Sequence, residues 1–126
     1  MGDRESYLQF ARMRLGRLPN TALLHESSIE ETEPVGPGPQ GPYLNQMVLL
    51  KSDLSPHTLL KHLLEIERQA GRKRSVQWGP RTLDLDLVRY GTLVVRESDL
   101  ALPHPEIDNR DFWQREIAEL ELNGRS

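Results

Sequence analysis

A nine-residue run from Pro34 to Pro42 is the strongest constraint on the fold, because it holds four prolines and three glycines. Proline fixes φ and has no amide hydrogen, so this run can be neither a helix nor a central strand. The segments on either side, 21–32 and 43–51, have the alternating or apolar pattern of β-strands. We therefore expect two strands joined by a rigid loop.

Amphipathic helices are expected on both sides of these strands. Residues 5–18 carry apolar side chains at steps of three and four. Ser55-Pro56 is a strong helix start, and Gly71 is a typical helix end. A third helix is expected over 109–120.

The segment from Thr82 to Tyr90 alternates cleanly and predicts a further strand, with Tyr90-Gly91 turning into a hairpin arm over 92–96. Leu102–Pro105 is expected to be a rigid loop. The resulting order α, β, β, α, β, β, α, with helices between strand pairs, is that of an α+β sandwich.

Length and composition are those of one ordinary domain, and we treat residues 1–126 as such. The absence of cysteine excludes disulfides, thiolate metal sites and cysteine nucleophiles. A net charge of −3 gives no overall attraction to nucleic acid or to anionic membranes. With no long apolar run and no signal-peptide pattern, we expect a cytoplasmic protein.

Asp84 and Asp86 are the sharpest chemical signal. Residues two apart on a strand share a face and lie ~7 Å apart, which suits ligation of a divalent cation or a pair of cations. Oxygen ligands without cysteine favour Mg²⁺. The alternative is an ordinary solvated strand face, although aspartate is disfavoured in strands.

The loop before these aspartates is basic and carries an indole. Guanidinium groups bind phosphate oxygens bidentately, and an indole can stack on a planar ring. Carboxylates that bind metal beside such a loop are what phosphoryl transfer requires, although no Walker motif is present. A solvated, mobile basic loop is the plainer interpretation. The residues concerned are Arg72, Lys73, Arg74, Trp78 and Arg81.

Two further groups of side chains are weaker candidates. His104 lies between two prolines, with Arg110 six residues later, and could contact phosphate; a lone histidine is more often structural. Tyr43 and Asn45 share a face by parity and would suit a flat heterocycle, although an ordinary strand start is about equally plausible.

Together these segments closely resemble one family, the 6-hydroxymethyl-7,8-dihydropterin pyrophosphokinases of folate biosynthesis. The resemblance covers the chain from Gly2 to about Leu120, and its most specific part is the run Trp78–Leu87. The other motifs that carry it are Glu31–Gly36, Tyr43–Asn45, Gly71-Arg72 and Leu102–Pro105.

The resemblance implies a ferredoxin-like α+β sandwich, an antiparallel sheet with helices packed on it. It implies transfer of the β,γ-pyrophosphoryl group of ATP to the hydroxymethyl oxygen of the dihydropterin, with release of AMP. Asp84 and Asp86 would hold two Mg²⁺ ions, and Arg72 and Arg81 would contact the transferring phosphates. ATP contacts would come from Glu67, Trp78, His104 and Arg110, and the pterin pocket from Thr32, Glu33, Val35, Tyr43, Asn45 and Phe112.

One departure concerns the N-terminus. The family has a strand before the segment matched by Gly2-Asp3-Arg4, so the first, central strand is expected to be absent from this chain. Its loss would expose a sheet edge and favour dimerisation, whereas the family implies a monomer. A smaller departure is Glu30, where the family commonly has an aromatic residue.

Three other functions stay open at this point. The chain could be a truncated or inactive family member that binds only nucleotide. It could be an RNA-binding ferredoxin-like module, although it lacks the aromatic strand motif of such modules and is negatively charged. D-x-D strands also bind Mn²⁺ in nucleotide-sugar transferases, whose folds are normally far larger. We expect small-molecule partners, ATP and a dihydropterin, with neither nucleic acid nor membrane.

Overall fold

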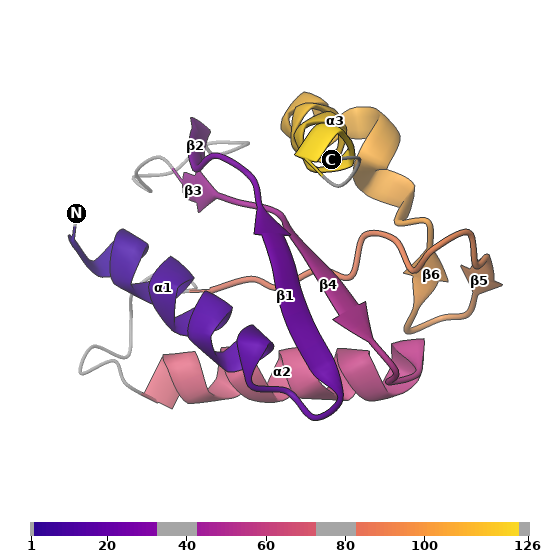
Figure 1. Cartoon of the computed structure of the whole chain (residues 1–126), viewed down its shortest axis with the longest axis horizontal. Coiled ribbons are helices and arrows are strands. Elements are labelled where there is room, and N and C mark those ends of the chain that lie inside the picture. Colours follow the sequence, from indigo (N-terminus) through magenta and orange to yellow (C-terminus); the bar gives the residue numbers. More distant parts are fainter. Residues whose placement is uncertain (1, 33–42, 73–82, 124–126) are drawn as a thin grey trace.

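A computed structural model describes residues 2–32, 43–72 and 83–123 (Figure 1). These residues form an α+β structure in which three α-helices accompany three short antiparallel strand pairs. In chain order the elements are α1 (Gly2–Gly16), β1 (Thr21–Glu26), β2 (Glu30–Thr32), β3 (Tyr43–Asn45), β4 (Val48–Ser52), α2 (Pro56–Arg72), β5 (Val95–Arg96), β6 (Ala101–Leu102), the 3₁₀-helix η1 (Pro105–Asn109) and α3 (Asp111–Asn123).

The core lies where α1 and α2 pack together against the β1–β4 pair and the extended chain after residue 83. The predicted helices 5–18 and 55–71 are confirmed with end shifts, and their apolar stripes supply most of the buried side chains. Each fully buried aliphatic side chain stabilises the fold by about 1.5–3 kcal/mol. The cluster consists of Ala11, Leu15, Leu18, Leu59, Leu63, Ile66, Ala70 and Leu83.

The two expected strands 21–32 and 43–51 are each broken into two. Strand β1 pairs with β4, and β2 pairs with β3, so together they form one long antiparallel hairpin with an interruption near Ser27. At the interruption Ser27 N donates to Met47 O (2.8 Å), and Met47 N donates to the Ser27 hydroxyl (2.8 Å) instead of to a carbonyl. Gln46 Nε2 donates to the carbonyl of Ser27 (2.7 Å). Side chains thus replace ladder bonds where the strands bend.

The predicted strand from Thr82 to Tyr90 is not formed within the described residues 83–90. They are extended, but they form no ladder with any strand that the structure describes. The alternation acts through burial alone, because Leu83, Leu85 and Leu87 pack into the core. Alternating apolar residues indicate only which side of a segment faces the core. A β-strand also requires a neighbouring backbone with which to pair.

The turn expected at Tyr90-Gly91 is present. The hairpin expected around it is not formed by the described residues. Leu93 N donates to Tyr90 O (3.0 Å), and Gly91 has a positive φ of 56°. The arm that follows pairs with residues further along the chain: β5 pairs with β6, and the turn between them closes through Glu97 N and Leu100 O (2.9 Å).

Helix α3 stands apart from the main core, beside β2 and the end of β1 (Figure 1). It begins at Asp111, two residues later than expected. The 3₁₀-helix η1 includes the end of the predicted rigid loop, Pro105, and the first residue that was expected to be helical, Asn109. Glu119 accepts hydrogen bonds from the backbone amide and the hydroxyl of Ser28 (3.0–3.1 Å). None of the helices in the described part of the chain is long and apolar enough to cross a bilayer.

We predict that Ser27→Ala destabilises the fold by about 1–3 kcal/mol, because the amide of Met47 loses its acceptor in a part-buried place. Urea unfolding followed by circular dichroism measures the change. Ser98→Ala, in the exposed β5–β6 turn, is the control and should change stability by less than about 0.5 kcal/mol. Equal effects of the two substitutions would contradict the role given to Ser27.

Candidate active site

The two aspartates predicted as metal ligands lie on the solvent side of segment 83–90. Both Asp84 and Asp86 are exposed, while the leucines between and beside them point inward. The predicted common face is therefore confirmed, although its cause is burial of the leucines, since segment 83–90 joins no sheet among the described residues. Two exposed carboxylates on one side provide hard oxygen donors of the kind that Mg²⁺ prefers.

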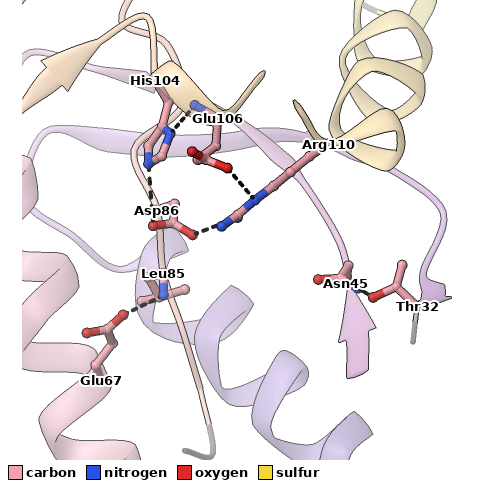
Figure 2. A network of polar contacts seen from close by, with 8 residues as sticks. All are labelled: Thr32, Asn45, Glu67, Leu85, Asp86, His104, Glu106 and Arg110. Atoms are coloured by element: carbon pink, nitrogen blue, oxygen red, sulfur yellow. Dashed lines mark hydrogen bonds and ion pairs between the residues drawn. The ribbon is translucent and has the colours of Figure 1, made fainter. Parts of the chain in front are cut away.

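Asp86 lies between the two basic residues that the sequence singled out downstream. His104 Nε2 is 3.9 Å from Asp86 Oδ1, and Arg110 Nη1 is 3.9 Å from Asp86 Oδ2 (Figure 2). These are ion-pair distances and exceed those of hydrogen bonds. The three side chains are 23–42% exposed, so the cluster is open to solvent and its groups are only loosely paired.

His104 is oriented by its surroundings. Its backbone amide donates to Val88 O (2.8 Å), which ties the loop to segment 83–90. Its Nδ1 accepts from the amide of Glu106 (3.1 Å), so the neutral ring carries its proton on Nε2, the atom that faces Asp86. The ring also meets Trp113 edge-on, with centroids 4.9 Å apart.

Arg110 is held over the ring of Trp113. Its guanidinium carbon lies 4.4 Å from the indole centroid, and its Nε lies 3.9 Å from Glu106 Oε1. A guanidinium over an indole face is a favourable cation–π contact. Sequence analysis missed Trp113, which is 6% exposed and supports both basic side chains. Its position three residues after Arg110 was the available signal, since residues three apart are neighbours on a helix.

Glu67 connects α2 to the acidic segment. Its Oε2 accepts a hydrogen bond from the amide of Leu85 (2.5 Å), the residue between the two aspartates (Figure 2). The Glu67 carboxylate thus takes the place of the strand carbonyl to which such an amide donates in a sheet. Glu67 was expected near the nucleotide, and the structure gives it a contact that positions both aspartates.

A second group of expected residues lies on the β2–β3 pair. Asn45 Nδ2 donates to Thr32 Oγ1 (2.5 Å), and both residues lie apart from the Asp86 cluster in Figure 2. Tyr43 is the register partner of Thr32 and is 41% exposed. Phe112 is on the first turn of α3, which packs beside β2. The structure therefore brings sheet and helix members of the expected pterin pocket to neighbouring elements.

Five expected site residues lie wholly or partly outside the described residues. Arg72 ends α2, but its side chain is not described. The remaining four, Glu33, Val35, Trp78 and Arg81, fall in 33–42 and 73–82.

Glu116 is a buried carboxyl group that sequence analysis also missed. It is 2% exposed, and its Oε2 has no hydrogen-bond partner within the described part of the chain. Burial, and then the charge of Glu30 and a hydrogen bond with it, raise the pKa of Glu116 to about 8. Its neighbours Trp113 and Leu120 on α3 are buried as well, so the helical spacing 113, 116, 120 was the signal.

A separate group of metal-compatible side chains lies at the start of α2. His57, Glu97 and Asp99 each offer one ligand atom, and these atoms lie within 4.8 Å of one another. His57 Nε2 is 2.8 Å from Glu97 Oε1, and all three residues are exposed. This group could not be predicted from the sequence, because Glu97 and Asp99 are brought to His57 by the β5–β6 turn.

The geometry defines an α+β protein with an open cluster of carboxylates and cations, suited to binding a metal-bound polyphosphate. A family model described as 7,8-dihydro-6-hydroxymethylpterin-pyrophosphokinase matches residues 1–122. The chain belongs to this family.

Individual relatives agree with the family match. The 2-amino-4-hydroxy-6-hydroxymethyldihydropteridine pyrophosphokinase of Bacillus subtilis is 39% identical over 95% of this chain and 72% of its own length. The protein of the same name from Haemophilus influenzae is 39% identical over 83% of this chain and 66% of its own length. That from Aquifex aeolicus is 34% identical over 98% of this chain and 76% of its own length. The matches thus span two thirds to three quarters of these relatives.

We predict that Glu67→Ala lowers the free energy of unfolding by about 1–3 kcal/mol, because the amide of Leu85 is left without its acceptor. Glu67→Gln, which keeps an acceptor oxygen at the same place, should retain most of the stability. Urea unfolding of the three proteins measures this. A Gln variant as unstable as the Ala variant would show that the Leu85 hydrogen bond is not what Glu67 contributes.

Proposed function

We propose that this chain transfers the β,γ-pyrophosphoryl group of ATP to 6-hydroxymethyl-7,8-dihydropterin, as its family membership implies. In this reaction the hydroxymethyl oxygen forms a bond to the β-phosphorus, the bond between that phosphorus and the oxygen retained by AMP breaks, and the hydroxyl proton is released. The observation that carries the proposal is the cluster of Asp86, His104 and Arg110 beside Asp84, within a chain that matches the family over residues 1–122.

Asp84 and Asp86 would hold the divalent cations, for which we propose two Mg²⁺ ions. Bound Mg²⁺ would neutralise phosphate charge and polarise the phosphoryl oxygens. The support from this chain is the pair of exposed carboxylates on one side of an anchored segment. Glu67 would keep that segment in place through the Leu85 amide.

His104 and Arg110 would bind oxygens of the nucleotide. The Nε2–H of His104 and the guanidinium of Arg110 already flank Asp86, and the 3.9 Å separations leave both groups able to turn toward a phosphate. A guanidinium keeps its charge and offers a planar pair of donors to phosphate. Arg72 and Arg81 would contact the transferring group, and Trp78 would lie on the nucleotide, as the family resemblance implies.

The dihydropterin would lie between the β2–β3 pair and α3. Tyr43 and Phe112 would stack on its two faces, and Asn45 would offer donor and acceptor atoms to its edge, with Thr32, Glu33 and Val35 completing the pocket. The support is that Thr32 and Asn45 share a face and that Phe112 begins the helix packed beside it. The partners would be these two small molecules alone, and the reaction would take place in the cytoplasm with a monomeric enzyme.

The deciding experiment is an assay of AMP release from ATP and Mg²⁺ with and without the dihydropterin. Release that requires the pterin supports the proposal. ATP binding without transfer would identify an inactive, nucleotide-binding family member, and metal-independent RNA binding would identify an RNA module.

We predict that Asp84→Ala and Asp86→Ala each lower kcat by about 100-fold or more, because each removes a carboxylate that would hold Mg²⁺ beside the transferring group. Both side chains are exposed, so folding should change little. Glu97→Ala, an exposed carboxylate elsewhere, is the matched control and should keep its activity. Substantial turnover by either aspartate variant at saturating Mg²⁺ would defeat the metal assignment.

We propose a ferredoxin-like sandwich as the finer architecture, in which one further strand pairs with residues 83–90. The support is the extended backbone of these residues, which carries inward leucines but no ladder within the described chain. Among described residues its backbone bonds are local or isolated, such as that from His104 N to Val88 O.

We predict that an N-terminal extension of about six residues, the usual length of a strand, raises both the melting temperature and the activity. The added segment would alternate β-branched and polar residues, as a half-buried strand does. A Gly/Ser extension of equal length is the control, since it cannot supply the side chains of a buried strand. Equal melting temperatures and turnover for the two extended proteins and residues 1–126 would contradict the missing-strand proposal.

A further inference from the structure

The contact between α3 and β2 contains a carboxyl pair. Glu116, on α3, is 2% exposed, and its Oε2 has no partner in the described part of the structure. Its closest electrostatic partner is Glu30, the first residue of β2, with which it shares a hydrogen bond. Glu30 is partly buried, with 27% of its side chain exposed. Contact between it and the buried Glu116 is favourable only if the two carboxyl groups share a proton, because two adjacent negative charges would repel.

Arg115 pairs with Glu30, the other member of the pair. Its Nη2 and Nε lie 2.8 Å and 3.2 Å from Glu30 Oε2. Both contacts use the same oxygen, which leaves the other one for the O–H of Glu116. A neutral Glu116 then has only a carbonyl oxygen unpartnered, which costs far less than a buried, unpartnered carboxylate.

The pair lies between the two walls of the proposed pterin site. Glu30 is the register partner of Asn45, and Thr32 is two residues further along β2, so their side chains share the face that meets α3. Phe112 precedes Glu116 by four residues, one turn of the same helix. The Glu30–Glu116 contact, together with those of Arg115 with Glu30 and of Glu119 with Ser28, therefore ties the helix that carries Phe112 to the strand pair that carries Asn45.

We propose that Glu116 is a positioning residue for dihydropterin binding: in its neutral form it fastens α3 to β2 through Glu30, and loss of its proton loosens this contact and weakens the pterin site. The inference depends on the proposed function in one respect, namely that the ligand is a dihydropterin. The loosening of α3 is a property of the chain itself and can be measured without a ligand.

The charges around the pair favour this response. Glu30 faces Glu116 from β2, and Glu119 and Arg115 face it from α3. Ionisation of Glu116 would leave three carboxylates against one guanidinium. Since the pKa of Glu116 is raised to about 8, the group is mostly neutral at pH 6.5 and mostly ionised at pH 9.

The test measures dihydropterin affinity of the full chain by calorimetry at pH 6.5 and pH 9, with an ATP analogue as reference ligand. If only the neutral form binds, the apparent Kd of the wild type should rise about tenfold at pH 9, where about one molecule in ten retains the proton. Glu116→Gln keeps a neutral donor and acceptor, so its affinity should stay nearly constant. Glu121→Gln, an exposed change on the same helix, should behave as the wild type.

A measurement without ligand tests the role of Glu116 even if the proposed function is wrong. The fluorescence of Trp113, one residue after Phe112, is followed against pH in a Trp78→Phe background, because the chain has two tryptophans. The wild type should show a transition near pH 8 that Glu116→Gln lacks. Absence of pterin binding at any pH would contradict the proposed function but not the role of Glu116 in holding α3. A wild-type fluorescence titration identical to that of Glu116→Gln, or an equal alkaline loss of pterin affinity in both, would overturn the role of Glu116.

Discussion

Burial of alternate leucines in segment 83–90 is the constraint on which the site depends. Leu83 is 6% exposed, and Leu85 and Leu87 pack against the same cluster, so Asp84 and Asp86 must face outward. The segment has no ladder within the described residues and is held instead by the leucines and by isolated hydrogen bonds. At about 1.5–3 kcal/mol for each fully buried aliphatic side chain, leucine burial outweighs any single one of those bonds.

The sequence predicted the features that local chemistry determines. Helices α1 and α2 follow from apolar spacing and from Ser55-Pro56, and the common face of the aspartates follows from alternation. The strand over 83–90 could not be judged in this way, because pairing depends on a second backbone whose presence alternation does not report. The break near Ser27 was equally hidden, since it depends on a hydroxyl that meets the amide of Met47, twenty residues away.

The same distinction, between local chemistry and contacts made by packing, applies to the site residues. Asp86, His104 and Arg110 were chosen singly, for their chemistry or by family resemblance, and the structure brings them together through the His104–Val88 hydrogen bond. Trp113 and Glu116 were missed because each looks like an ordinary position on an amphipathic helix. Their roles arise from what the helix packs against, which periodicity does not contain.

The start of α3 links the two halves of the proposed site. Arg110, just before the helix, lies beside Asp86, while Phe112, two residues later, belongs to the side of the proposed pterin pocket. A shift of α3 would therefore move a nucleotide contact and a pterin contact together. Glu30, at the start of β2, is partly buried and contacts both Arg115 and the buried Glu116. This contact between two carboxyl groups is favourable only while one proton stays in place, so the spacing of the two walls becomes dependent on pH.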